Sequence, residues 1–222
     1  MSKITRYFVG AACLFALTGW LVIGFPGREF LAQAQESREP AASPAVAGTY
    51  TGEIVIGKAD APVTIIEYAS MTCPHCANFH NKVLPLIKQK YIDTGKVKLA
   101  FREFPLDGVA LRASMLARCG GKAKVVPFLD ILFTQQMDWA ASADPMGALN
   151  RIAKLGGMSQ TAFDSCLADE ELMKQLVQSR QEGMEKHNVQ GTPSFIIDGK
   201  THDGDMEIED FDKLLQPLIP AA

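Results

Sequence analysis

The sequence predicts an α/β fold in which a long helical stretch separates two groups of strands. Three runs of alternating or continuous hydrophobic residues predict strands at residues 53–56, 63–70 and 96–104. From about residue 105 to 187, hydrophobic residues instead recur at intervals of three and four, which is typical of helices. Strand character returns at residues 193–197, and a last helix is expected near the C-terminus, over 208–218.

Composition supports a globular domain of ordinary size. The chain has 222 residues, of which 47% are hydrophobic and 21% are charged, so it can bury a substantial core. Its formal net charge is only −3, which gives no reason to expect binding to nucleic acid.

The N-terminal residues 1–34 have the pattern of an export signal. Lys3 and Arg6 precede an uncharged apolar run over residues 8–25, and residues 32–34 have the small-x-small form of a signal peptidase site. The apolar run is also just long enough to span a bilayer, so cleavage and retention as a membrane anchor both remain open. Either way, the positive N-terminal end stays in the cytoplasm and the remainder is exported.

The folded part is expected to begin near Tyr50. Residues 35–49 are rich in Ala, Ser and Pro and lack periodicity, which predicts a linker. Of the five cysteines, Cys13 lies in the apolar run, and four follow the predicted signal. An even number of cysteines suits an exported domain, because that environment permits disulfides.

The most informative stretch is Cys73-Pro74-His75-Cys76, which lies between the strand at 63–70 and a run with helical spacing. Cys73 falls at the helix start, where unpaired N–H groups and the helix dipole favour a thiolate. Pro74 suits the first turn because it lacks an N–H, and a protonated His75 would add positive charge. Cys76 lies one turn on, close enough to form a disulfide. A thiolate stabilised in this way leaves easily, which makes the disulfide a strong oxidant.

Other interpretations of this motif are weaker. A c-type haem site needs a histidine directly after the second cysteine, where this chain has Ala77. Structural zinc usually takes a second clustered pair of ligands, which the sequence lacks, so no metal and no other cofactor is expected. A purely structural short-range disulfide stays open. Solvated or capping roles are expected for the remaining histidines, which are His80, His187 and His202.

The motif, the helical stretch and Gly191-Thr192-Pro193 before the late strand together resemble the DsbA family of thiol–disulfide oxidoreductases. The resemblance covers about residues 50–220. It implies a thioredoxin fold formed by residues 50–105 and 188–222. It also implies an all-helical domain, residues 106–187, inserted between the third strand and the cis-proline strand.

The same resemblance implies a mechanism and partners. Cys73 would be the exposed nucleophile and Cys76 the resolving thiol, and a cis bond between Thr192 and Pro193 would face them. The Thr192 backbone would then be free to pair with an extended substrate. The implied substrates are unfolded or newly exported cysteine-containing proteins, and a DsbB-like, quinone-linked membrane oxidase would reoxidise the dithiol. The implied protein is a monomer in the periplasm, free or tethered to the inner membrane.

Glu67 lies six positions before Cys73, in the preceding strand. A buried carboxylate near Cys76 could relay a proton, with a pKa raised by burial. Glu67 could equally be a structural residue paired with a strand neighbour. Members of the family place a lysine in the adjacent strand, and the candidates for that position here are Lys98 and Arg102.

Cys119 and Cys166 fall on two different predicted helices of the insertion. A second disulfide is favoured over two buried thiols, and it would stabilise the fold by about 4 kcal/mol in the chain-entropy model. Some DsbA-like proteins carry such a bridge, which agrees with this interpretation.

Two further functions stay open beside oxidation of exported proteins. Thr192 resembles the isomerase and reductase branches at that one position, although a dimerisation domain is missing. A non-enzymatic holdase is the third alternative, and it would not need an intact dithiol.

Overall fold

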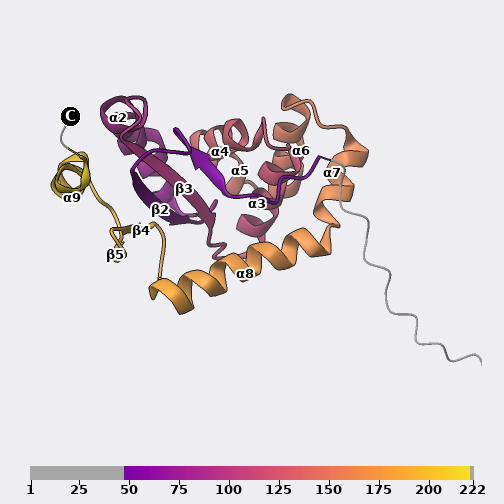
Figure 1. Cartoon of the computed structure of the whole chain (residues 1–222). Coiled ribbons are helices and arrows are strands. Elements are labelled where there is room, and N and C mark those ends of the chain that lie inside the picture. Colours follow the sequence, from indigo (N-terminus) through magenta and orange to yellow (C-terminus); the bar gives the residue numbers. More distant parts are fainter. Residues whose placement is uncertain (1–47, 221–222) are drawn as a thin grey trace, which may run out of the picture. The chain divides into compact units, whose positions relative to one another are not determined.

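The computed structural model describes residues 48–220 (Figure 1). The predicted signal at residues 1–34 lies outside the described residues, as does almost all of the predicted linker at 35–49. Among the described residues, no helix is both long and apolar enough to cross a membrane.

A mixed sheet of five strands forms the centre of the fold, in the order β1-β3-β2-β4-β5. The central strand, β2, is parallel to its neighbour β3, and every other pair is antiparallel. Aliphatic residues such as Ile65 and Leu99 pair at the middle of the sheet and are completely buried. The strands are β1 (Ile54–Ile56), β2 (Val63–Ala69), β3 (Val97–Glu103), β4 (Ser194–Ile197) and β5 (Lys200–Asp203).

One continuous helical stretch connects β2 to β3 and includes two π-helical segments. Its buried side is apolar, with Phe79, Val83 and Ile87 at intervals of four residues. The stretch consists of α1 (Pro74–Asn78), η1 (Phe79–Val83), α2 (Leu84–Ile87) and η2 (Lys88–Ile92). After the sheet is complete, α9 (Ile208–Leu215) and the short 3₁₀ helix η3 (Gln216–Leu218) end the described chain.

Six helices lie between β3 and β4 in the described part of the chain. Aspartate side chains cap several of them, as when Asp107 accepts from the Ala110 amide at the start of α3. The six helices are α3 (Gly108–Cys119), α4 (Val125–Thr134), α5 (Gln136–Ala140), α6 (Pro145–Leu155), α7 (Gln160–Leu167) and α8 (Glu170–His187). The long α8 runs from α7 back past the sheet, so it links the insertion to the strands (Figure 1). The predicted α/β class, a thioredoxin fold with a helical insertion, is confirmed.

Three details differ from the sequence-based prediction. The hydrophobic period over residues 125–138 predicts one helix, but the structure has two, because the backbone leaves helical geometry at Gln135. The last α-helix ends at Leu215 and continues as a 3₁₀ turn. The edge strand β5 was not predicted, since its sequence, Lys-Thr-His-Asp, is polar throughout and half-exposed to exposed.

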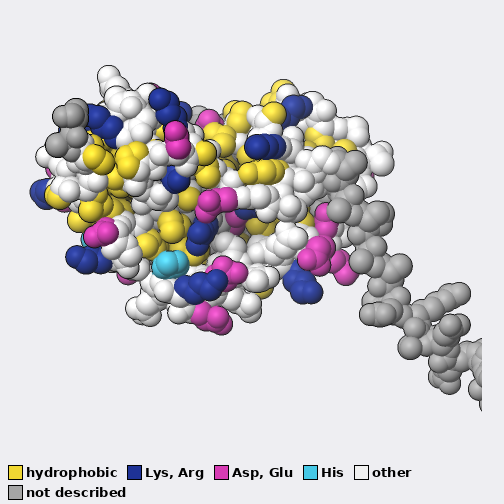
Figure 2. All heavy atoms as spheres, in the orientation of Figure 1, with side chains coloured by type: hydrophobic (Ala, Val, Ile, Leu, Met, Phe, Trp, Pro, Cys, Tyr) yellow, Lys and Arg dark blue, Asp and Glu magenta, His cyan; other side chains and the backbone are white. Residues whose placement is uncertain are grey.

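Buried side chains form a main core that joins the strands, the first helical stretch, α9 and helices of the insertion. A smaller cluster surrounds the C-terminal end of α3 and consists of Met115, Cys119, Cys166, Leu172 and Leu176. Outside, basic and acidic side chains are interspersed with apolar ones over the face shown in Figure 2. This mixture agrees with the small net charge of the chain.

Candidate active site

The dithiol lies where β2 ends and α1 begins. Cys73 is the N-cap residue of α1 and has extended backbone geometry, and Pro74 occupies the first helical position. The Cys73 amide donates to the Ser70 carbonyl at 3.1 Å, and the Ala77 amide donates to the Cys73 carbonyl at 3.2 Å. The local sequence therefore fixes the first cysteine at the helix terminus.

Gln136 holds this turn from the insertion. Its side chain is buried, and its Nε2 donates to the carbonyl oxygens of Met71 at 2.8 Å and Cys73 at 2.9 Å. Helix α5 thereby satisfies two carbonyls of the dithiol turn. Sequence analysis missed Gln136, because nothing in its local pattern connects it to a motif more than sixty residues earlier.

The peptide bond between Thr192 and Pro193 is cis and lies against the dithiol. The Cys73 Sγ donates to the Thr192 carbonyl oxygen at 3.1 Å, across 119 residues of sequence. The Thr192 hydroxyl is buried and has no hydrogen-bond partner within residues 48–220. It is thus placed where it can donate to a thiolate at Cys73.

The two thiols have opposite acidities. A hydrogen bond from Cys76 is the largest effect on the pKa of Cys73 and lowers it from 9.0 to about 5. Burial opposes this lowering, while Thr192 and the backbone N–H groups of Cys76 and His75 assist it. For Cys76, burial raises the pKa most, and hydrogen bonding to Cys73 and the charge of Glu67 raise it further.

Cys73 is less accessible than expected for an exposed nucleophile. It is 6% exposed, whereas Cys76 is 0% exposed. The prediction of an exposed Cys73 was wrong in degree, because the Thr192 backbone lies beside its sulfur. Cys73 is nevertheless the sulfur nearer to solvent and the one able to ionise at neutral pH.

His75 acts on the dithiol through its backbone and carries an exposed side chain. Its imidazole is largely exposed, and Nδ1 contacts the Asp205 Oδ2 at 2.5 Å. Among the groups that lower the pKa of Cys73, His75 acts through its backbone N–H. His75 therefore provides a helical N–H group to the thiolate, and the predicted contribution of its imidazole charge stays a prediction.

Glu67 is completely buried, and its partner is His80. The His80 Nε2 lies 3.0 Å from both carboxylate oxygens. Neither predicted lysine-like partner reaches Glu67, because Lys98 donates to the Ala59 carbonyl and Arg102 is engaged elsewhere. The prediction that Glu67 pairs with a strand neighbour was therefore wrong, as was a solvated or capping role for His80.

The second pair of cysteines is joined. Cys119 at the end of α3 and Cys166 in α7 form a disulfide with a Cα–Cα distance of 6.0 Å. This is the pairing that the sequence favoured, and it leaves Cys73 and Cys76 as the free thiols of the described chain. Within residues 48–220, no group of three or more His, Cys, Asp or Glu side chains could hold a metal ion.

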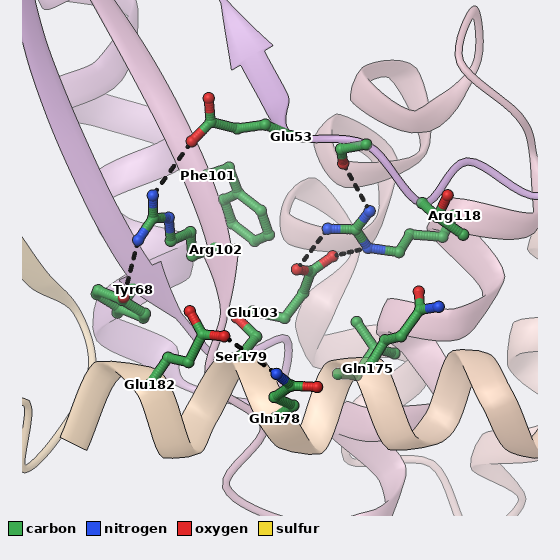
Figure 3. A pocket seen from close by; sticks show the side chains of 13 residues that line it. Glu53, Tyr68, Phe101, Arg102, Glu103, Arg118, Gln175, Gln178, Ser179 and Glu182 are labelled. Carbon is green, nitrogen blue, oxygen red and sulfur yellow. Dashed lines mark hydrogen bonds and ion pairs between the residues drawn. The ribbon is translucent and has the colours of Figure 1, made fainter. Parts of the chain in front are cut away.

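A separate hollow of about 370 Å³ lies between the sheet and α8 (Figure 3). Both of its arginines already have partners. Arg102 donates hydrogen bonds to Glu53 and to the Tyr68 hydroxyl. Arg118 donates two hydrogen bonds, of 2.6 and 2.8 Å, to the Glu103 carboxylate. A charged ligand would have to displace these partners. We therefore assign the chemistry of this chain to the dithiol.

The dithiol can carry out thiol–disulfide exchange. A low-pKa sulfur next to solvent can be attacked or can leave, and a buried high-pKa sulfur can close or open the intramolecular bond. The adjoining cis-proline segment offers backbone groups beside the reactive sulfur.

Comparison with known proteins agrees with this geometry. A family model described as Thioredoxin matches residues 49–217. The crystal structure of Wolbachia pipientis alpha-DsbA1 has a TM-score of 0.68 and 36% identity, covering 76% of this chain and 93% of that one. The oxidised BdbD structure from Bacillus subtilis has a TM-score of 0.66 and 25% identity, covering 78% and 97%.

One relative known from sequence is longer than this chain. A candidate protein-disulfide oxidoreductase of Rickettsia bellii is 37% identical over 148 residues, which is 66% of this chain and 57% of that protein. The chain thus spans less than two thirds of the length of this relative. The chain belongs to the DsbA family of thiol–disulfide oxidoreductases, within the thioredoxin superfamily.

Proposed function

We propose that this chain is a thiol oxidase that introduces disulfide bonds into exported proteins. The observation that carries the proposal is the opposite acidity of Cys73 and Cys76 beside the Thr192 backbone. Ionisation of Cys73 at neutral pH stabilises the reduced enzyme. A disulfide whose reduced form is stabilised is a strong oxidant.

In the proposed cycle, a client thiolate attacks the Cys73 sulfur of the Cys73–Cys76 disulfide. That bond breaks, the client becomes bound to Cys73, and Cys76 leaves with the electron pair and takes up a proton. A second client thiolate attacks the client sulfur, and Cys73 leaves as a thiolate. The client has then lost two electrons and two thiol protons, and the enzyme has gained both electrons and one proton.

Two exposed apolar side chains beside the dithiol suit an unfolded client. Leu106 is 45% exposed, and its amide donates to Ser70 in the turn before Cys73. Met137 is 70% exposed and directly follows Gln136, which binds the Cys73 carbonyl. Flexible methionine side chains adapt to varied partners, which fits a catalyst with many clients.

Export, location and reoxidation complete the proposal. The apolar N-terminal run would direct the chain to the periplasm, as a free monomer or tethered to the inner membrane. A DsbB-like membrane oxidase would accept the two electrons from Cys73 and Cys76 and pass them to quinone. No metal or other cofactor of the chain takes part in this cycle.

Trapping of clients tests the roles of the two cysteines. With Cys76→Ala, the second sulfur cannot displace a client, so mixed disulfides with exported proteins should accumulate at Cys73. Cys73→Ala should trap none. Non-reducing gels and mass spectrometry of purified complexes would measure both, and equal trapping by the two variants would contradict the assignment.

The reduction potential of the Cys73–Cys76 pair separates oxidase from isomerase or reductase. Equilibration with glutathione should give a value near the oxidising end of the family range, on the order of −120 mV. A value near that of thioredoxin, about −270 mV, would favour a reductase instead. Client refolding by the Cys76→Ala variant would favour an isomerase.

A further inference from the structure

The imidazole of His75 is held by a residue far along the chain. Its Nδ1 lies 2.5 Å from the Asp205 Oδ2, although 130 residues separate the two in sequence. Their side chains are 65% and 44% exposed, respectively. A ring nitrogen this close to a carboxylate oxygen donates its N–H to it, and the two form an ion pair whenever the imidazole is protonated. Asp205 therefore fixes the direction in which the His75 ring points.

The position of Asp205 is itself fixed, because the short segment between β5 and α9 is bound to the cis-proline turn. The Gly204 amide donates to the Pro193 carbonyl oxygen at 2.9 Å. The Asp203 Oδ1 accepts from the Ser194 hydroxyl at 2.5 Å. Both contacts fasten the residues directly before Asp205 to the turn that lies against the dithiol. The carboxylate is thus held beside the active site by the sheet and not by α1.

The neighbouring acidic residues of this segment have local roles. Asp203 binds Ser194 on the adjoining strand, and the Glu207 amide donates to the Asp210 carboxylate at the start of α9. The carboxylate of Asp205 differs, because the partner that it contacts belongs to the Cys-Pro-His-Cys motif. Its contact with His75 therefore affects the dithiol more directly than the fold of its own segment.

The same imidazole starts next to the reactive sulfur. The backbone N–H of His75 is one of the groups that lower the pKa of Cys73, so the His75 side chain begins beside that sulfur. A cation close to a thiolate stabilises it, and a more stable thiolate makes the disulfide more oxidising. In the observed conformation the ring donates to Asp205 instead, and the carboxylate offsets the charge of a protonated ring.

We propose that Asp205 is a positioning residue that holds the His75 imidazole away from the Cys73 sulfur and thereby limits the oxidising power of the dithiol. This inference rests on the proposed function, in which the Cys73–Cys76 disulfide oxidises clients, and it names a residue that regulates that oxidation. Without the carboxylate, the imidazole would be free to approach Cys73 and stabilise its thiolate. The limit favours turnover, because a less stabilised thiolate returns more readily to the disulfide.

The reduction potential of Asp205→Ala tests this assignment. Protein would be equilibrated with graded ratios of reduced and oxidised glutathione at pH 7, alkylated and analysed by mass spectrometry. We expect the equilibrium constant to shift about threefold toward the reduced protein, within the range of an exposed charge pair. Because a tenfold change equals about 30 mV, the potential should rise by about 14 mV. A purely structural residue would not make the dithiol more oxidising.

The His75→Ala background shows whether this shift passes through the imidazole. His75→Ala alone should keep the native potential, since the ring is already turned toward Asp205. Adding Asp205→Ala to His75→Ala should cause no shift, so the two substitutions should be non-additive. Glu209→Ala removes another exposed carboxylate, in the first turn of α9, and is the matched control for loss of one negative charge. It should also keep the native potential.

A native potential in Asp205→Ala would overturn the assignment. An equal rise in the double variant or in Glu209→Ala would overturn it too, because the shift would then come from a loosened turn or from net charge. Any of these outcomes would leave the oxidase proposal intact if Cys76→Ala still traps clients. A strongly reducing native potential would contradict the oxidase, whereas the differences between variants would still test Asp205.

Discussion

Cys73 and Cys76 differ in acidity because they occupy different parts of the same helical turn. The first caps the helix and receives hydrogen bonds from Cys76, Thr192 and backbone N–H groups. The second lies inside the core, where no charge is easily solvated. The proposed division of labour between nucleophile and resolving thiol rests on this difference within one turn of helix.

This acidity predicts that the reduced protein is the more stable form at neutral pH. Folding lowers the pKa of Cys73 from 9.0 to about 5, so the reduced form gains stability as pH rises through this range and loses it on acidification. Because pH 7 lies about two units above the folded pKa, ionisation of Cys73 adds about 2–3 kcal/mol to the unfolding free energy of the reduced form. The oxidised form has no thiolate and lacks this contribution. Denaturant unfolding of both forms at several pH values measures the difference.

The stability difference between the reduced and oxidised forms should vanish near pH 5. Thr192→Val removes a donor to the Cys73 thiolate and should reduce this difference at pH 7. His75→Ala tests the observed geometry, because the variant keeps the backbone N–H that assists Cys73, and the stability difference should therefore persist. A more stable oxidised form at pH 7 would refute the assignment of Cys73 as the acidic thiol.

Individual residues were predictable where their role is local. Cys73 and Pro74 could be placed from the helix start alone, because capping depends on neighbouring residues. The partner of Glu67, His80, could not be predicted in this way, because pairing of a strand residue with a helix residue depends on how the strand and the helix pack. A signal was nevertheless present: Cys76 and His80 are separated by four residues, which puts them on one side of a helix.

At the scale of elements, helix α5 stabilises the dithiol turn through Gln136. Gln136→Met keeps the length of the side chain but leaves the Met71 and Cys73 carbonyls without their donor. Because buried unsatisfied groups cost about 1–3 kcal/mol each, we expect a loss of at least ~2 kcal/mol in unfolding free energy. Client oxidation should slow as well, since the turn that presents Cys73 is loosened.

Gln181→Met, at an exposed position of α8, is the matched control and should unfold with a free energy within about 0.5 kcal/mol of the native value. Unchanged stability in Gln136→Met would mean that water replaces the amide, and the turn would then not depend on the insertion.

Elements with a strong hydrophobic period were predictable, and those without one were not. The strands β2 and β3 and most insertion helices have buried faces that set their period. The strand β5 pairs only with β4 at the edge of the sheet and has no buried face, so its sequence lacks a pattern. The break at Gln135 depends on packing between α4 and α5, which periodicity does not describe.

At the scale of the whole molecule, the disulfide joins two separated parts of the insertion. Cys119 and Cys166 are 47 residues apart, and their side chains lie in the cluster that α8 covers. Replacing both by alanine should lower the unfolding free energy by about 4 kcal/mol, since the unfolded chain regains the freedom of that loop. Thermal or denaturant unfolding in the presence and absence of the bridge measures this loss.

Graded reductant should open Cys73–Cys76 well before Cys119–Cys166, because the lowered pKa of Cys73 makes it a good leaving group. Simultaneous opening of both bridges would show that the insertion exchanges with the dithiol. The cysteine spacing alone could not determine this pairing, because a bridge requires that α3 and α7 pack side by side.

The order of the four described cysteines has a consequence for how the molecule is made. Four cysteines allow three pairings, and the observed Cys119–Cys166 bridge together with the proposed Cys73–Cys76 bond joins first with second and third with fourth. Each pair is complete before the next begins to emerge during synthesis. A newly made chain that closes its cysteines in order of appearance therefore reaches this connectivity without any reshuffling.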